Sequence, residues 1–331
     1  MRAIVYTAVG GPEVIAIREA PTPAPGPGQI RVRVKAAGLN RADIYQRRGG
    51  YPAPPGWPAD IPGLEYAGEV DALGAGVSRW RPGDRVMGLV GGGGQAEAVV
   101  VRQQEALPLP ANLSYAEGAA IPEVFYTAYD ALVTRGRLAA GERVLIHAVG
   151  SGVGTAAAQI AKHLGATVIG TSRSADKLAR AQTYGVDVGI DTSHTAFEDA
   201  VGDPVHVVLD VLGAGALAAN LGVLALRGRL VILGLMAGRR GEIDLEPVLK
   251  KRLEIIGSVM RSRGPEERAA LAAEFAERML SLFESRDGRA PILRPVLERA
   301  YPMERLAEAH EVMERNENFG KLVGRWEDGE R

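Results

Sequence analysis

The 331-residue sequence contains no cysteine, which excludes disulfide bonds, thiolate catalysis and thiolate ligation of a metal. Its five histidines do not supply the close pairs that are typical of zinc sites; they are His147, His163, His194, His206 and His310. His147 ends an apolar run, so we expect a hydrogen-bonded core residue at this position. The sequence therefore predicts a function that does not depend on a protein-bound metal.

An excess of charge of one sign and long apolar runs are also lacking. A formal net charge of −1 gives no electrostatic reason to expect nucleic acid or an anionic membrane as a partner. No apolar run reaches the length of a membrane span, and the first residues, M-R-A-I-V-Y, are typical of a strand and not of a signal peptide. We therefore expect a cytoplasmic protein, and 331 residues are enough for two domains.

A glycine-rich turn between two apolar runs is the clearest functional signal. Residues 144–148 predict a buried strand, a helix-period run ends at Gly165, and residues 167–171 predict a second strand. The turn before the helix consists of Gly150, Ser151, Gly152, Val153 and Gly154. Glycines there let backbone N–H groups approach a pyrophosphate at the helix N-terminus. This unit predicts a dinucleotide-binding site; the alternative is a structural turn without a ligand.

The pattern of apolar residues changes along the chain. Residues 1–122 show short alternating strands and turns, which predict a mainly β domain. A helix is expected at residues 122–135, and strands and helices alternate after it. This alternation predicts an α/β domain with a parallel sheet covered on both faces, a Rossmann doubly wound sheet, whose last strand is residues 253–258.

The turn spacing carries a family resemblance. It reads A-x-x-S-x-x-G, from Ala148 through Ser151 to Gly154. It is similar to the A-x-x-G-x-x-G turn of the quinone oxidoreductase branch of the medium-chain dehydrogenase/reductase superfamily. The serine, together with V-L-I-H-A and S-G-V-G-T-A-A, resembles the subgroup typified by the p53-inducible quinone oxidoreductase. The resemblance covers essentially the whole chain.

The resemblance implies a domain arrangement and an assembly. It implies a GroES-like catalytic domain formed by residues 1–122 and 263–331, and a Rossmann domain formed by residues 123–262. In this family the edge strand, here residues 253–258, pairs with its symmetry mate, so we expect a homodimer.

The resemblance also implies a zinc-free substrate pocket. Where zinc enzymes of the superfamily place metal ligands, this chain has G-L-N-R-A-D, with Asn40, and P-G-L-E-Y-A-G, with Glu65 and no preceding histidine. The segment N-R-A-D-I-Y-Q-R-R-G-G-Y-P implies that Asn40, Tyr45 and Tyr51 line the pocket beside the nicotinamide. The alternative is that Asn40 caps a helix and the tyrosines are packing residues. Asp43 is expected to bond the backbone of its own turn.

Two further residues are candidates for contact with the cofactor. Ser151 could place a hydroxyl near the nicotinamide or the pyrophosphate, or it could simply be small enough for the turn. Thr127, in F-Y-T-A-Y, matches a family position against the cofactor.

The residues after the second strand indicate which cofactor binds. Enzymes that use NAD place an acidic residue there to bond the ribose hydroxyls, whereas this chain has T-S-R-S-A-D-K. With Ser174 as the helix cap, Lys177 lies in the first turn, where a bound anion would compensate its unfavourable interaction with the helix dipole. We therefore expect Ser172, Arg173 and Lys177 to bind the 2′-phosphate of NADPH. Some family members add a tyrosine at a position that is Thr192 here.

Together these features predict an NADPH-dependent, zinc-free quinone reductase, with the nicotinamide as hydride donor. Two alternatives stay open from the sequence. One is an NADPH-dependent reductase of α,β-unsaturated carbonyls, which would use the same pocket chemistry. The other is an NADPH-binding structural or regulatory protein without turnover.

Overall fold

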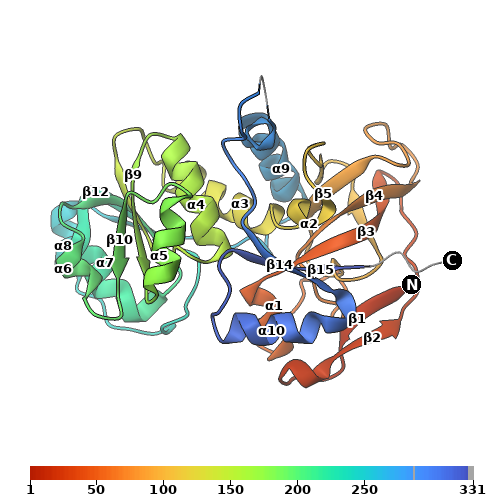
Figure 1. Cartoon of the computed structure of the whole chain (residues 1–331), viewed down its shortest axis with the longest axis horizontal. Helices are drawn as coiled ribbons and strands as arrows, with labels where there is room; N and C mark the ends of the chain where they lie inside the picture. The colour runs from red at the N-terminus through yellow and green to blue at the C-terminus, as the bar shows by residue number, and fades with distance from the viewer. Residues whose placement is uncertain (286–287, 327–331) are drawn as a thin grey trace. The chain divides into compact units, whose positions relative to one another are not determined.

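The structure is a computed structural model that describes residues 1–285 and 288–326 (Figure 1). The chain folds into two compact units, Met1–Tyr126 with Met260–Arg331 and Thr127–Val259. The domain boundaries after residues 122 and 262 stay a prediction.

The unit of Thr127–Val259 contains a six-stranded sheet in the order β10-β9-β8-β11-β12-β13, and every neighbouring pair is parallel. Its strands are β8 (Arg143–Ile146), β9 (Thr167–Ser172), β10 (Val188–Asp191), β11 (Val205–Asp210), β12 (Leu224–Ile232) and β13 (Glu254–Gly257). The chain order reverses between β8 and β11, which makes this a doubly wound Rossmann sheet with its switch point between these strands. The predicted α/β fold is therefore confirmed.

Helices cover this sheet, with α4 against β8 and β9, α5 against β9 and β10, and α7 and α8 against β12 (Figure 1). They are α4 (Gly152–His163), α5 (Ala175–Gln182), α6 (Phe197–Ala200), α7 (Leu217–Val223) and α8 (Leu245–Lys251). The inward face of α4 is apolar and buried, including Ile160 and Ala161. Gly165, with φ of 81°, follows α4 in the left-handed conformation and confirms the predicted helix stop.

The other unit is built on a seven-stranded sheet, in the order β14-β15-β3-β4-β5-β7 with β6 paired to β3, and on the hairpin β1-β2. Its strands are β1 (Arg2–Tyr6), β2 (Ile15–Glu19), β3 (Gln29–Leu39), β4 (Glu65–Leu73), β5 (Arg85–Leu89), β6 (Ala98–Arg102), β7 (Ala106–Pro108), β14 (Leu297–Pro302) and β15 (Lys321–Arg325). The alternation in β3 buries Ile30, Val32 and Val34 in one core, as the sequence pattern predicts.

Short helices complete this unit and lead out of it. They are α1 (Arg41–Arg47), α2 (Tyr115–Gly118), α3 (Pro122–Tyr129), α9 (Pro265–Met279) and α10 (Leu306–Glu314). The helix expected at residues 122–135 is continuous only to Tyr129, because Asp130–Arg135 winds as a π-helix. Short 3-10 turns occur at Pro12–Val14, Gly213–Ala216, Leu280–Phe283 and Met303–Arg305.

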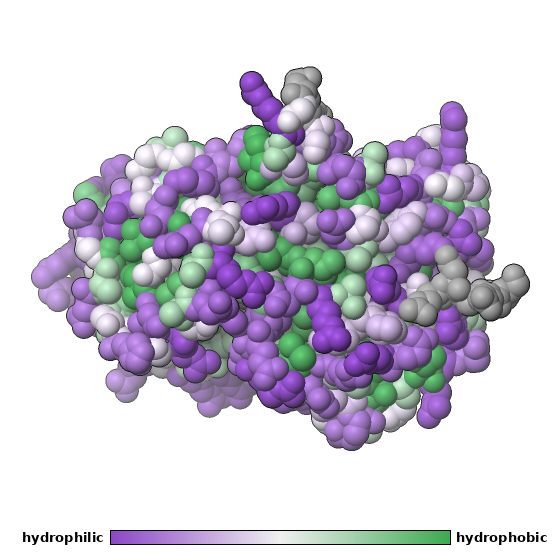
Figure 2. Space-filling view, in the orientation of Figure 1, coloured by the Kyte–Doolittle hydropathy of each residue, from purple (hydrophilic) through white to green (hydrophobic). Residues whose placement is uncertain are grey.

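The surface carries both hydrophilic and hydrophobic residues (Figure 2). Hydrophilic residues predominate on the face drawn in Figure 2, with apolar residues in smaller groups. Among the helices of the described residues, none combines the length and the hydropathy needed to span a bilayer.

Candidate active site

The glycine-rich turn joins β8 to α4, and Ser151 is the N-cap of that helix. Its Oγ accepts a hydrogen bond of 3.0 Å from the Gly154 N–H. The cap satisfies one first-turn donor, while the helix itself offers no carbonyl to the N–H groups of Gly152 and Val153. These two groups are available to an anion at the positive end of the helix dipole.

The geometry of the turn fits a dinucleotide. A Cβ on Gly154 would lie 2.6 Å from the Ala148 carbonyl oxygen, so only glycine lets the helix pack this closely on the turn. Ala148 itself has φ of 50°, a left-handed conformation that directs the chain sharply out of β8. The residues of this turn, at the switch point of the sheet, can therefore hold a pyrophosphate. Gly150 lies in the same turn, and its contact with the cofactor stays a prediction.

The end of β9 carries the predicted 2′-phosphate residues. Ser174 is the N-cap of α5 and accepts a hydrogen bond of 3.3 Å from the Lys177 N–H, so the predicted cap is confirmed. Ser172 ends β9, and its Oγ accepts from the Ser174 N–H at 3.2 Å. Arg173 between them is exposed. The structure thus brings Ser172, Arg173 and Lys177 to one strand end.

The neighbouring strand adds two residues to this end of the sheet. The Thr192 N–H donates to the Ser172 carbonyl at 2.9 Å, so Thr192 lies beside the candidate phosphate site. Asp191, which the sequence interpretation overlooked, is in register with Ser172. Its Oδ1 accepts hydrogen bonds from the Ser193 N–H and hydroxyl at 2.9 and 2.5 Å, which hold the carboxylate in its own turn.

His147 is a core residue, as predicted. Its ring is buried, with Nδ1 3.0 Å from Thr171 Oγ1 and Nε2 2.7 Å from Asn220 Oδ1. Burial lowers the pKa of this imidazole, so it is neutral at neutral pH.

In the other unit, Asn40 belongs to a buried ionic network. It is the N-cap of α1, and its Nδ2 donates to Glu65 Oε1 at 2.8 Å. The Lys321 ammonium donates to Asn40 Oδ1, Glu65 Oε1 and the Leu39 carbonyl, at 2.7, 2.6 and 2.9 Å. All three ammonium protons therefore have oxygen acceptors. These bonds fix the Asn40 amide, and one Nδ2 proton beyond the Glu65 bond has no acceptor among the described residues.

The surrounding backbone is shaped to hold this network. A Cβ on Gly38 would lie 2.1 Å from Glu65 Oε1, so glycine is required where the carboxylate crosses β3. The other Glu65 oxygen, Oε2, accepts from the Glu123 N–H at 2.8 Å. Asp43 bonds the Asn40 and Gly63 N–H groups at 2.8 and 3.2 Å, which confirms its expected structural role. Burial raises the pKa of Asp43 to about 6.

Tyr51 is held by an arginine that sequence reasoning missed. Arg261 donates to the Tyr51 carbonyl at 2.7 Å, and its guanidinium carbon lies 4.9 Å from the centroid of the Tyr51 ring. The same guanidinium bonds Gly91 O and Gln46 Oε1, at 2.9 and 2.7 Å. Burial raises the pKa of Tyr51 to about 12, so the phenol is a hydrogen-bond donor at neutral pH. Tyr45, in α1, is 41% exposed.

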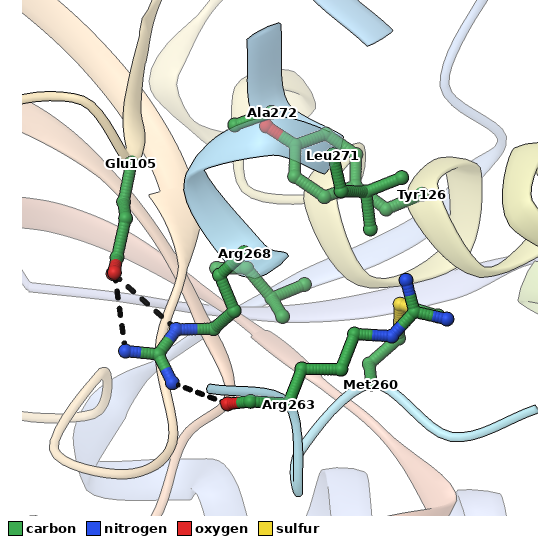
Figure 3. A pocket seen from close by; sticks show the side chains of 8 residues that line it. Glu105, Tyr126, Met260, Arg263, Arg268, Leu271 and Ala272 are labelled. Carbon is green, nitrogen blue, oxygen red and sulfur yellow. Dashed lines mark hydrogen bonds and ion pairs between the residues drawn. The ribbon is translucent and has the colours of Figure 1, made fainter. Parts of the chain in front are cut away.

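A separate small cavity lies beside the Glu105–Arg268 ion pair (Figure 3). Its volume of about 10 Å³ is enough for roughly one water molecule and far too small for a quinone. Its lining includes Tyr126, whose buried hydroxyl has no hydrogen-bond partner among the described residues.

Comparison with known proteins connects the two regions to one family. Residues 26–111 match the family described as "Alcohol dehydrogenase GroES-like domain", and residues 152–278 match "Zinc-binding dehydrogenase". The quinone oxidoreductase of Lama guanicoe is 32% identical over 98% of this chain and 97% of its own length. The chain belongs to the medium-chain dehydrogenase/reductase superfamily, among its quinone oxidoreductases.

Solved structures of this superfamily have the same fold. An NAD-dependent alcohol dehydrogenase has a TM-score of 0.85 and 34% identity, covering 99% of this chain and 100% of its own. The mycobacterial protein Rv1454c, complexed with NADPH, has a TM-score of 0.84 and 28% identity, covering 98% and 100%. As a member of this family the protein is an oxidoreductase of the quinone or enoyl reductase kind. It binds a nicotinamide cofactor and acts on a small molecule, so the alternative without turnover is not retained.

Within residues 1–285 and 288–326, no group of three or more histidine, cysteine, aspartate or glutamate residues is arranged to hold a metal ion. Asn40, which stands where zinc enzymes of the superfamily place a ligand, bonds the Lys321 ammonium together with Glu65. In the sequence, the sign of this network was a lysine at the start of the apolar strand β15, but the sequence did not show which residues bond it.

Proposed function

We propose that this oxidoreductase transfers a hydride from NADPH to a quinone without a catalytic metal. The observation that carries the proposal is the Lys321 ammonium bound to Asn40 and Glu65. A fixed internal cation bound to Asn40, which stands where zinc enzymes of the superfamily place a ligand, supports metal independence, because a metal there would have to displace a fully hydrogen-bonded ammonium.

The cofactor preference rests on the end of β9. Arg173 and Lys177 offer two positive charges and Ser172 a hydroxyl, a set suited to a phosphate and not to a ribose hydroxyl. Asp191 would compete for that role only by leaving its bonds to Ser193. The bound nicotinamide supplies the hydride. Gly150, Ser151, Gly152, Val153, Gly154 and Thr127 are proposed to hold the rest of the cofactor.

The substrate pocket is proposed to be lined by Asn40, Tyr45 and Tyr51. The Tyr51 phenol and the remaining Asn40 amide proton are donors that can bond an oxygen on which negative charge develops. The same donors would serve an alkenal, which is the second candidate substrate class. The protein is further proposed to act as a homodimer through the edge strand β13.

The experiment compares a quinone with an alkenal under NADPH oxidation, with and without prior chelator treatment. We expect turnover of the quinone, exceeding that of the alkenal, and no loss after chelation. Chelator-sensitive activity with stoichiometric zinc would refute metal independence. A preference for the alkenal would select the second substrate class.

A further inference from the structure

Tyr51 lies on a segment that has no regular structure to orient its phenol. Between the end of α1 at Arg47 and the start of β4 at Glu65, the chain forms neither helix nor strand. Tyr51 is half-buried, and among the described residues its one hydrogen bond comes from Arg261. The direction of the phenol therefore depends on tertiary contacts, because the local backbone does not fix it.

Arg261 joins three separate segments of its unit. Its Nη1 donates to the Tyr51 carbonyl at 2.7 Å, and its Nη2 donates to Gln46 Oε1 at 2.7 Å. Its Nε donates to the Gly91 carbonyl at 2.9 Å. The guanidinium carbon also lies over the Tyr51 ring, 4.9 Å from the centroid. One planar group thus contacts both the backbone and the ring of Tyr51, and it ties them to α1 and to the stretch after β5.

Gly91 connects this contact to the second aromatic ring of the same segment. A Cβ on Gly91 would lie 2.6 Å from Cδ1 and Nε1 of Trp57, so only glycine lets the indole pack this closely on the backbone. The carbonyl of the same glycine accepts from Arg261. Tyr51 and Trp57 are therefore held against one short stretch of chain, Tyr51 through the guanidinium and Trp57 directly.

Arg261 has no carboxylate partner, although it is only 5% exposed. Within residues 1–285 and 288–326 no acidic group forms an ion pair with it, and its three acceptors are neutral. A buried charge without an ion pair costs stability. Arg268, by contrast, is paired with the carboxylate of Glu105. A neutral side chain would serve packing at lower cost, so the cost at Arg261 points to a function of the guanidinium.

We propose that Arg261 is a positioning residue of the reaction that orients the Tyr51 phenol toward the substrate oxygen, an inference that rests on the proposed function. Arg261 acts through Tyr51 and not on the substrate itself. A hydrogen-bond donor stabilises developing negative charge only when it is held at the right distance and direction. By fixing the carbonyl and the ring of Tyr51, the guanidinium removes other orientations of the phenol before the substrate binds.

The test is a double-mutant cycle of Arg261→Lys and Tyr51→Phe. Lysine keeps the positive charge but lacks the planar fork and the flat face that contact Tyr51. Arg261→Lys should lower kcat for a quinone about tenfold and leave KM for NADPH unchanged. In the Tyr51→Phe background the same substitution should lower kcat less than about twofold, because the hydroxyl that it orients is absent. A general loss of structure would lower kcat by the same factor in both backgrounds.

Arg268→Lys is the matched control. Arg268 lies over the Trp57 ring, 5.6 Å from the centroid, but it bonds Glu105 and not Tyr51, so this variant should keep the wild-type quinone turnover. If Arg261→Lys lacks a cooperative urea transition, Gln46→Met replaces it in the cycle. That variant removes one of the three acceptors of Arg261 and should lower kcat about threefold, again only when the Tyr51 hydroxyl is present.

A second readout needs neither cofactor nor turnover. The Gly50 N–H, directly before Tyr51, donates to the Tyr45 carbonyl at 2.8 Å. Hydrogen exchange of this amide, followed by NMR, should be about tenfold faster in cofactor-free Arg261→Lys than in the wild type, and unchanged in Arg268→Lys. Equal exchange in all three proteins would show that Arg261 does not hold the segment, and it would overturn the proposal.

The outcomes separate the two proposals. If Tyr51→Phe lowers turnover but Arg261→Lys lowers kcat equally in both backgrounds, the role of Arg261 is wrong and the proposed pocket stands. If Tyr51→Phe keeps the wild-type turnover, the assignment of Tyr51 to the pocket fails, and the role of Arg261 fails with it. A wild type that reduces neither quinone nor alkenal overturns the proposed function as a whole.

Discussion

Lys321 is the residue on which the buried ionic network of Asn40 and Glu65 depends. Its side chain is 3% exposed and that of Glu65 is 0% exposed, so neither charge is solvated by water. Desolvation of this kind is compensated only when both partners and their remaining hydrogen bonds are in place. The arrangement orients Asn40 as well as neutralising Glu65.

Lys321→Met should therefore lower the free energy of unfolding by about 3–5 kcal/mol, because Glu65 would be left buried and unpaired. Urea unfolding measures the loss. Lys250→Met is the matched control, since Lys250 pairs with Glu246 at the surface and should cost less than about 1 kcal/mol. Adding Glu65→Gln to Lys321→Met should recover part of the loss; equal losses in the two lysine variants would contradict the account.

For single residues, the sequence indicated which residue types form the candidate site but not which partners they bond. Asn40 was recognised as a replacement for a metal ligand, and Asp43 as a local backbone partner. Lys321 lies 281 residues from Asn40 along the chain, so no local pattern could pair them. Arg261 and Glu123 were not predicted for the same reason, because their partners are brought to them only by the fold.

The turn into α4 is the element that we propose holds the pyrophosphate of the cofactor. Ser151 caps the helix, and relatives with A-x-x-G-x-x-G have glycine in its place. Ser151→Ala should cost about 1 kcal/mol of stability, whereas Ser151→Gly should cost only a few tenths, because glycine is a tolerable N-cap.

These two variants separate the cap from the chemistry. Both lack the hydroxyl, so if Ser151 donates toward the cofactor or substrate, kcat should fall equally in both. Steady-state kinetics and urea unfolding on the same preparations provide the comparison. If Ser151→Gly keeps the wild-type kcat, Ser151 acts only as a helix cap.

The element after β9 carries the predicted phosphate contacts. Each charge-assisted contact contributes roughly 1.5 kcal/mol at the low end, so Arg173 and Lys177 together should give about a hundredfold in affinity. Arg173→Ala with Lys177→Ala should raise KM for NADPH and leave KM for NADH nearly unchanged. A double variant that keeps its preference would place the phosphate site elsewhere.

Element order was largely predictable, because period-two and helical patterns reflect burial directly. The βαβ unit and the last strand of the parallel sheet occur where expected. The π-helix at Asp130–Arg135 was not predictable, because it continues the apolar spacing of the helix before it. The short elements β7 and α2 were missed because three or four residues carry too little periodicity.

Strand β13 is an edge strand of the six-stranded parallel sheet, and it carries exposed apolar side chains. Ile255 is 41% exposed, and Val259 beyond the strand is 47% exposed. An apolar edge of this kind is usually covered, and pairing with a second copy would extend the parallel sheet. We expect a dimer in sedimentation at micromolar concentration.

Ile255→Lys should dissociate this dimer, because pairing would bury the added charge. Val9→Lys, at a 72% exposed position in the other unit, should leave the assembly unchanged. A wild-type monomer, or a dimer that tolerates Ile255→Lys, would contradict assembly through β13.

We propose that this enzyme reduces quinones with NADPH. The most direct test is the ratio of kcat/KM for NADPH to kcat/KM for NADH, measured on the wild type with one quinone. The two contacts at Arg173 and Lys177 predict a ratio on the order of 100, shrinking at high salt because the site is exposed. A ratio near one would contradict this proposal, and a ratio in favour of NADH would point to Asp191 as the residue that selects the cofactor.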